Sequence, residues 1–267
     1  MSYASLLAPV AEGAITRTVA GITLEVLHRG AGRPILFLHG PDPLPPEAPV
    51  LEHLAALGSV VAPSHPGFGA SPRPDGFETM YDLMQVYAAL LDDLRDPTVV
   101  IGCSFGGWIA AELAVACPHR IARLVLVDAL GIRISADPMQ RDIMDFFNTH
   151  PQEVKRRSWH DPACAPDYDA MSDAALIRHA RNRDALCLYG WDPHMYNPRL
   201  HAWLHRIQLP TQVVWGESDQ VVTPAYGRAW AGGIPGARFA LIAAAGHHPE
   251  LEQPTAFAGC VADFLNR

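Results

Sequence analysis

Residues 99–108 read Val99-Val100-Ile101-Gly102-Cys103-Ser104-Phe105-Gly106-Gly107-Trp108. An apolar, β-branched run passes directly into Gly-x-Ser-x-Gly, and an alanine-rich segment follows. This order predicts a buried strand, a sharp turn at Ser104 and a helix, with the serine hydroxyl exposed where the strand ends. Gly102 and Gly106 let the backbone close around the turn, because they carry no Cβ. The motif is common by chance, so its strand and helix context is what favours a nucleophile at Ser104.

Strands and helices alternate over most of the chain. Apolar runs predict buried strands at 35–38, 60–62, 99–101, 124–127, 212–215 and 239–242. Helical spacing lies at 50–57, 80–94, 107–116, 224–232 and 254–265. This alternation predicts an α/β fold with a mostly parallel, doubly wound sheet covered on both faces. Segments 15–20 and 23–28, on either side of Gly21, predict an antiparallel hairpin at the sheet edge.

The alternation breaks between residues 131 and 206. No strand is predicted there, and helical spacing lies at 139–147, 151–159, 173–188 and 198–204. We therefore expect an α/β core of residues 1–130 and 207–267, with a helical cap of residues 131–206 inserted after the strand 124–127. The large apolar residues of the cap either line a pocket or hold the cap together: Phe146, Phe147, Trp159, Tyr189, Trp191, Met195, Tyr196 and Trp203.

A serine nucleophile needs a base, and the base needs an acid that orients it. On this kind of sheet the three residues follow in the order Ser, Asp, His. Asp219 comes directly after the strand 212–215, and His247 follows the strand 239–242. A single aspartate after a strand is commonly a turn residue, so the prediction depends on both residues occupying successive loops. Asp128, after the strand 124–127, is the alternative acid.

Segments spread over nearly the whole chain resemble the α/β-hydrolase superfamily. They are Phe37-Leu38-His39-Gly40, Gly102-Cys103-Ser104-Phe105-Gly106-Gly107, Leu126-Val127-Asp128, Trp215-Gly216-Glu217-Ser218-Asp219 and Gly246-His247-His248-Pro249-Glu250-Leu251-Glu252-Gln253-Pro254. The resemblance is nearest to the capped branch that includes carboxylesterases and the hydrolases of aromatic ring-cleavage products. Dehalogenases and epoxide hydrolases of this fold carry an aspartate at the sharp turn, so Ser104 argues against both.

The sequence departs from the family at the expected oxyanion hole. In the family, the residue after His-Gly commonly donates a backbone N–H to the hole. Here that residue is Pro41, which has no N–H. The resemblance implies Phe105 N–H as one donor. Either Asp42 N–H replaces the second donor or the hole is weak.

Two further departures concern the loops around the site. Ser64 stands where relatives usually carry an aspartate, so the expected carboxylate is lost while the bracing role of the loop is kept. Ring-cleavage hydrolases typically carry an asparagine before the serine and a tryptophan after the histidine. Cys103 and His248 occupy those positions, which makes carbon–carbon bond hydrolysis the second choice. We interpret Cys103 as a packing residue, since no base is placed for it.

The candidate pocket residues are His39, Trp159, Trp191, Tyr196 and His248. His39 is also interpreted as a brace for its loop, and His248 either lines the pocket entrance or lies exposed.

Charge and cysteine content exclude other classes of protein. The chain of 267 residues carries 20 basic and 28 acidic residues, and this net charge of −8 disfavours nucleic-acid and anionic-membrane partners. The only basic run, residues 155–157, is interpreted as a solvated helix face. The five cysteines lie far apart and specify neither disulfides nor a zinc site. The first residues, 1–12, lack a basic segment followed by a long apolar one, so we expect a cytoplasmic protein.

These observations predict a serine hydrolase for an ester, thioester or related carbonyl compound of small to medium, largely apolar character. Its partner is a small-molecule substrate, no metal or organic cofactor is expected, and monomer and homodimer are both open. The alternatives are a carbon–carbon bond hydrolase of ring-cleavage products, a cofactor-free lyase or oxygenase, and a ligand receptor with vestigial turnover.

Overall fold

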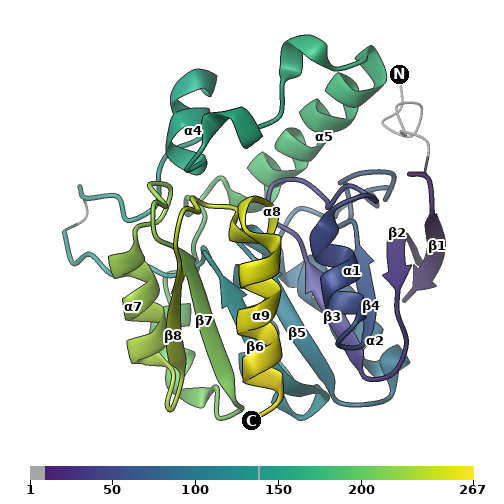
Figure 1. Ribbon diagram of the computed structural model, residues 1–267, viewed down its shortest axis with the longest axis vertical. Helices are drawn as coiled ribbons and strands as arrows, with labels where there is room; N and C mark the ends of the chain where they lie inside the picture. The colour runs from purple at the N-terminus through teal and green to yellow at the C-terminus, as the bar shows by residue number, and fades with distance from the viewer. Residues whose placement is uncertain (1–9, 138) are drawn as a thin grey trace.

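A computed structural model describes residues 10–137 and 139–267 (Figure 1). The sheet has eight strands in the order β1-β2-β4-β3-β5-β6-β7-β8. Only the β1–β2 and β2–β4 pairs are antiparallel. The strands are β1 Ala14–Val19, β2 Ile22–Arg29, β3 Pro34–Leu38, β4 Ser59–Pro63, β5 Thr98–Cys103, β6 Ile121–Val127, β7 Thr211–Gly216 and β8 Arg238–Ile242. The predicted fold class and edge hairpin are confirmed. The N-terminal residues 1–9, where no targeting segment was expected, lie outside the described residues.

Helices cover both faces of the sheet (Figure 1). Helices α1 and α9 pack on one face, and α2, α3 and α7 pack on the other. Alternate residues of β3 point to the two faces: Leu36 and Leu38 meet α2 and α3, whereas Ile35 and Phe37 meet α1 and α9. The main helices are α1 Pro49–Ala55, α2 Met80–Leu94, α3 Phe105–Ala116, α7 Pro224–Gly233 and α9 Pro254–Leu265.

The strand order places a binding site at the carboxyl ends of β3 and β5. Strand β4 lies on one side of β3, and the chain then crosses to β5 on the other side. In an open α/β sheet, ligands bind in the crevice where the direction of winding changes in this way. The segment after β3 begins with His39 and the segment after β5 begins with Ser104, so both border this crevice.

The segment between β6 and β7 contains helices, of which α4 and α5 lie beyond the carboxyl edge of the sheet (Figure 1). Its α-helices are α4 Pro151–Ser158, α5 Asp173–Gly190 and the short α6 Leu200–Trp203. Helix α8, Pro249–Glu252, lies at the same edge of the sheet. In the described part of the chain, no helix is both long and apolar enough to cross a lipid bilayer.

The helix expected at 139–147 is not formed. The Asp142 carboxylate accepts hydrogen bonds from the amides of Ile134 and Ser135, at 2.8 and 2.9 Å. The amide of Met144 donates to the carbonyl of Val221 at 2.9 Å. A helix would have paired the Met144 amide internally, and the Asp142 contacts hold the segment against residues 134–135. Tertiary contacts therefore override the helical spacing.

Candidate active site

Ser104 lies in a sharp turn between β5 and α3. Its backbone has φ 51° and ψ −115°, a conformation that L-residues adopt only when the surroundings enforce it. The amide of Ser104 donates to Val127 O at 2.8 Å, and its carbonyl accepts from the Leu130 amide at 3.1 Å. A Cβ on Gly106 would collide with the carbonyl oxygen of Leu38. The turn therefore needs glycine at this position.

Three side chains form a continuous line of hydrogen bonds. His247 Nε2 lies 2.8 Å from Ser104 Oγ, and His247 Nδ1 lies 2.8 Å from Asp219 Oδ2. Asp219 Oδ1 also accepts the amides of Val221 and Val222, at 2.7 and 3.2 Å. The network assigns the Nδ1–H tautomer to His247, because the carboxylate can only accept. Nε2 is then free to take a proton from the serine, so the three residues predicted from the sequence are brought together.

The loops that carry Asp219 and His247 are joined to each other and to α8. The amide of Ser218 donates to Ala245 O at 2.9 Å. The amide of Gly246 donates to the carboxylate of Glu252, a residue of α8, at 2.7 Å. Both bonds fix the backbone next to the acid and the base, so the imidazole is positioned by the fold before any ligand binds.

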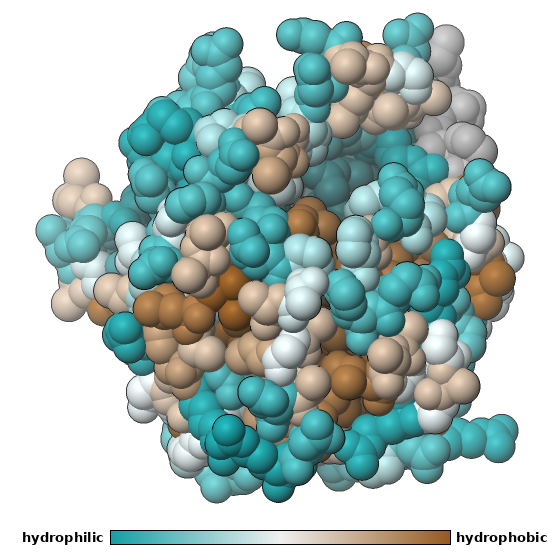
Figure 2. Space-filling view, in the orientation of Figure 1, coloured by the Kyte–Doolittle hydropathy of each residue, from teal (hydrophilic) through white to brown (hydrophobic). Residues whose placement is uncertain are grey.

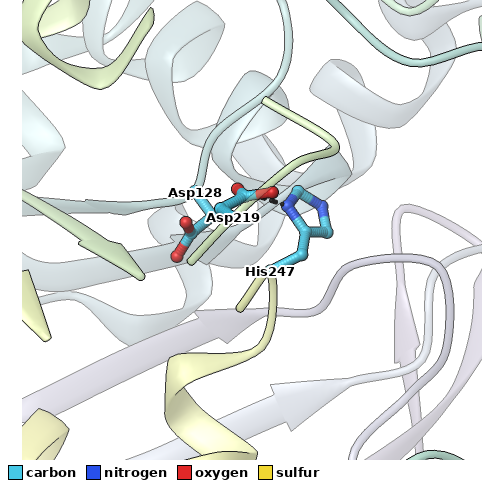
Figure 3. Close-up of side chains that lie close together, drawn as sticks. All are labelled: Asp128, Asp219 and His247. Carbon is cyan, nitrogen blue, oxygen red and sulfur yellow. Dashed lines mark hydrogen bonds and ion pairs between the residues drawn. The ribbon is translucent and has the colours of Figure 1, made fainter. Parts of the chain in front are cut away.

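Asp128, the alternative acid, lies beside Asp219 and is not bonded to His247. Figure 3 shows Asp219 between Asp128 and His247. Asp128 is fully buried, and its Oδ1 accepts the Gly216 amide at 3.0 Å. Burial raises the pKa of its carboxyl group well above the usual range, and the charge of Asp219 and a hydrogen bond with Asp219 raise it further.

Metal-binding side chains gather only once in the described part of the chain. Ligand atoms of Asp128, Asp219 and His247 lie within 4.8 Å of one another. The hydrogen bonds just described already use these atoms. His201 and His205 lie four residues apart, a spacing that can place two histidines on one face of a helix. Each uses Nδ1 on a backbone carbonyl, and no third ligand residue joins them among the described residues.

The expected oxyanion loop lies directly against Ser104. A Cβ on Gly40 would approach the Cβ of Ser104 to 3.1 Å. Phe105 is the first residue of α3, and such residues have amides without an intrahelical partner. The Asp42 carboxylate accepts from His179 Nδ1 at 3.1 Å and from Asn182 Nδ2 at 2.7 Å. Through Asp42, the loop is anchored to helix α5.

His39 and His65 form a buried stack behind this loop, with ring centroids 3.7 Å apart. His39 Nε2 accepts the amide of His65 at 2.9 Å, and His39 Nδ1 donates to Gly40 O at 2.8 Å. His65 in turn donates from Nε2 to His39 O at 2.9 Å and bonds Tyr87. Burial lowers the pKa of His39 well below its usual range and that of His65 to about 3. Both rings are therefore neutral, and His39 braces the loop as expected.

A carboxylate that the sequence analysis missed supports the loop at Ser64. Glu25 of β2 is buried and accepts Ser64 Oγ and the amide of Ala70, each at 2.9 Å. Relatives usually carry the carboxylate in the Ser64 loop itself. Here it comes from the neighbouring strand, so the departure at Ser64 is compensated. The available signal was a single acidic residue within the apolar strand segment 22–27.

A cavity of about 1270 Å³ opens above Ser104 and His247. Figure 2 shows the surface hollowed between the segment that contains α4 and α5 and the body of the molecule. Three expected pocket residues, His39, Trp159 and His248, line the cavity.

Trp191 and Tyr196 were expected in the pocket, but they lie outside it. Trp191 is 62% exposed and packs on Phe147. The Tyr196 hydroxyl accepts from Arg133 at 3.2 Å. Both residues follow the end of α5, whereas the cavity-lining residues of α5 belong to its earlier turns. Their position beyond the end of α5 therefore places them away from the site.

His248 contributes a polar group to the cavity wall. Its ring packs against that of Trp159 with centroids 4.5 Å apart and the planes tilted by 31°, and its Nδ1 lies 3.8 Å from Glu250 Oε1. Burial opposes its charged form, but Glu250, at ion-pair distance, and the charges of Asp219 and Glu252 outweigh this and raise the pKa of His248. Cys103 contributes no nucleophile, because burial raises the pKa of its thiol well above the usual range.

The alpha/beta hydrolase family model matches residues 35–259, which is most of the chain and includes Ser104, Asp219 and His247. The protein belongs to the α/β-hydrolase family. It is 28% identical over 262 residues to a 2-hydroxymuconate semialdehyde hydrolase of Pseudomonas sp. strain CF600, covering 92% of this chain and 91% of the relative.

Solved structures share the fold of this hydrolase-family chain. A meta-cleavage product hydrolase from Pseudomonas fluorescens IP01 (CumD) superposes with a TM-score of 0.77 at 20% identity, covering 94% of this chain and 97% of that one. A thermophilic esterase from Thermogutta terrifontis gives a TM-score of 0.71 at 23% identity, covering 95% and 98%.

Proposed function

We propose that the protein is a serine hydrolase that cleaves carboxylic esters or thioesters through an acyl-enzyme. The observation that carries this proposal is the line of 2.8 Å contacts from Ser104 to His247 to Asp219 at the floor of the cavity. A hydroxyl, a base that faces it and an acid that orients the base are the parts that acyl transfer requires.

The reaction follows from the assigned tautomer. Ser104 Oγ attacks the substrate carbonyl while its proton passes to His247 Nε2. Asp219 stabilises the imidazolium through Nδ1–H. The tetrahedral intermediate collapses, and His247 returns the proton to the leaving oxygen or sulfur. Water, deprotonated by His247, then attacks the acyl-enzyme, and Ser104 leaves with the proton. No step requires a metal or an organic cofactor.

Two backbone amides are proposed to hold the oxyanion. Phe105 N–H lies at the start of α3, where the helix dipole also favours negative charge. Asp42 N–H is the second proposed donor, since Pro41 has none. The bonds from α5 to the Asp42 carboxylate hold Asp42 in place within the loop that contacts Ser104.

The proposed substrate has a larger acyl or leaving group than the sequence suggested. A cavity of about 1270 Å³ exceeds the roughly 300–1000 Å³ of common small-molecule sites. Its apolar lining includes Leu130, Phe146, Phe147, Trp159 and Leu186. Residues 131–206 act in this proposal as the cap that closes over the substrate, since α4 and α5 supply much of the wall.

Carbon–carbon bond hydrolysis is a second candidate, because the curated relatives include 2-hydroxymuconate semialdehyde hydrolases and 2-hydroxy-6-oxo-2,4-heptadienoate hydrolase. It needs the same base and a polar site for a dienoate. Cys103 and His248 stand in place of the asparagine and tryptophan typical of that branch, so we rank it below ester hydrolysis.

A substrate panel separates these reactions. Wild-type protein and Ser104→Ala are assayed with p-nitrophenyl acetate, butyrate, octanoate and benzoate, and with a 2-hydroxy-6-oxo-hexadienoate. The proposal expects turnover of the esters, highest for the bulky ones, and a loss of several orders of magnitude in Ser104→Ala. Turnover of the dienoate alone would transfer the assignment to the second candidate. Equal ester turnover by both proteins would refute the mechanism.

A further inference from the structure

Two carboxyl groups lie side by side in the interior next to the proposed base. Asp128 is 0% exposed and Asp219 is 2% exposed. One oxygen of each lies within 4.8 Å of the other and of a ring nitrogen of His247. In the described part of the chain, neither group has a lysine or arginine within ion-pair distance; the partner of Asp219 is His247. A neutral imidazole cannot balance two adjacent negative charges.

Two buried like charges at this spacing are strongly unfavourable, so one carboxyl group keeps its proton. The hydrogen bonds identify which one. Asp219 receives three N–H donors: the amides of Val221 and Val222, and His247 Nδ1. Among the residues that the structure describes, Asp128 receives only the amide of Gly216. Donors stabilise the ionised form, so the charge resides on Asp219.

We propose that Asp128 keeps its proton at neutral pH and donates a hydrogen bond to Asp219, as a positioning residue for the carboxylate that orients His247. The proposal rests on the proposed serine-hydrolase function. The direction of the pKa of Asp128, raised by burial and then by Asp219, agrees with it, and Glu250 also disfavours its ionisation.

The backbone of Asp128 is held for this purpose. It has a φ of 43°, in the left-handed region that a short polar residue tolerates better than most. Its amide donates to Val214 O at 3.1 Å, and its carboxyl oxygen accepts from Gly216, so both ends of the residue are tied to β7. Both of its carboxyl oxygens lie near the Gly216 amide, at 3.0 and 3.3 Å, and the proposed proton bonds Asp219. Asp128 thus supplies a fourth donor to the carboxylate, beside the three N–H groups.

Two substitutions test whether Asp128 acts on Asp219 as a hydrogen-bond donor or through a negative charge. Asp128→Asn keeps an acceptor for Gly216 and an N–H donor for Asp219, whereas Asp128→Ala removes both. With a bulky p-nitrophenyl ester, we expect Asp128→Ala to lower kcat about ten- to hundredfold with KM little changed, the size expected for losing a hydrogen bond to a charged group. We expect Asp128→Asn to retain at least roughly a third of the wild-type kcat, because the amide reproduces the donor.

The pH profile reports the charge of Asp128 rather than its packing. The titratable groups around it are Asp219, Glu250, the Cys103 thiol and, through Asp219, His247. If Asp128 is uncharged, Asp128→Asn leaves the acid side of the kcat/KM profile in place. An ionised Asp128 would favour protonated His247, and its neutralisation would then move the acid side of the profile to lower pH. Such a shift would overturn the proposal.

Infrared difference spectroscopy detects the proton on Asp128 without an activity assay. At pH 7, wild-type minus Asp128→Asn should show the C=O band of a protonated carboxylic acid. Loss of a carboxylate band instead would overturn the proposal, as would full activity in Asp128→Ala. If Asp128→Ala fails to fold, the Asn variant and its spectrum decide. If the wild-type protein hydrolyses no ester, the proposed function fails, and the infrared band still tests the proton on Asp128.

Discussion

The backbone amide of His247 donates a 2.7 Å hydrogen bond to the backbone carbonyl of Ser158, the last residue of α4. The proposed catalytic base is therefore fastened directly to the segment between β6 and β7. A second bond, from the Gln220 amide to Arg157 O at 3.2 Å, ties the Asp219 loop to the same helix. The segment between β6 and β7 thus holds the loops of Asp219 and His247 in place in addition to forming a cavity wall.

Gly246→Ala tests this connection. A Cβ on Gly246 would lie 2.5 Å from Ser158 O and 2.8 Å from His160 N, both backbone atoms that cannot rotate away. The end of α4 and the His247 loop must then separate. We expect kcat to fall at least about tenfold for short and long esters alike, because a misplaced catalytic group costs rate for every substrate.

Gly259→Ala is the matched control, since no atom lies within 4 Å of its added Cβ and the position is within α9. It should leave kcat unchanged and stabilise the protein by up to about 1 kcal/mol. Wild-type kcat in Gly246→Ala would show that the contact with α4 does not position the base.

The cavity lining predicts that substituting two tryptophans has different effects on KM. Trp159 lines the cavity, whereas Trp191 is outside it and 62% exposed. Trp159→Ala should raise KM for a benzoate or octanoate ester about tenfold or more, because a large aromatic contact is worth roughly 1.5–3 kcal/mol. KM for the acetate ester should change less.

Trp191→Ala serves as the control and should alter neither substrate. Equal effects of the two substitutions on bulky esters would contradict the assigned cavity.

The buried histidine stack predicts acid sensitivity of the fold. His39 and His65 are neutral in the native protein because burial lowers their pKa values, that of His65 to about 3. In the unfolded chain they take up protons below about pH 6.5, so the unfolded state binds more protons and stability falls with falling pH. The stabilisation is complete above pH 6.5 and is lost between about 6.5 and 3.

Urea unfolding at pH 8, 6.5, 5.5 and 4.5 measures this loss. Each histidine contributes a slope of up to about 1.4 kcal/mol per pH unit. In His65→Gln the slope below pH 6.5 should be shallower by about one such contribution. The same slope in both proteins would mean that His65 becomes protonated within the fold.

The hydrogen bond between Glu25 and Ser64 predicts that substitutions at these two residues have coupled effects on stability. Glu25→Gln removes the charged acceptor of the Ser64 hydroxyl and should destabilise the fold by about 1–3 kcal/mol. Ser64→Asp places a second buried carboxylate beside Glu25 and should destabilise it as well. In the variant that combines Glu25→Gln with Ser64→Asp, one carboxylate remains, and it lies in the loop at residue 64. We therefore expect a double-mutant cycle to show a favourable coupling of about 0.5–3 kcal/mol. Strict additivity would show that the two sites are independent.

The features that the sequence predicts well are local ones. The β-branched run before Ser104 and the loops after β7 and β8 place the proposed nucleophile, acid and base without knowledge of distant contacts, because parallel strands end at the same edge. Glu25 could not be assigned a role in this way, since its partner Ser64 is 39 residues away in the chain. The segment 139–147 has helical spacing, but its polar groups bond elsewhere.

The covalent intermediate on Ser104 is the central claim, and peptide mass spectrometry after reaction with a fluorophosphonate probe tests it most directly. The account predicts stoichiometric labelling of the peptide that contains residues 102–107, at Ser104, with none in Ser104→Ala and labelling slowed by about 10³- to 10⁴-fold in Asp219→Asn. A label on the neighbouring Cys103, or an equal rate of labelling in Asp219→Asn, would contradict it.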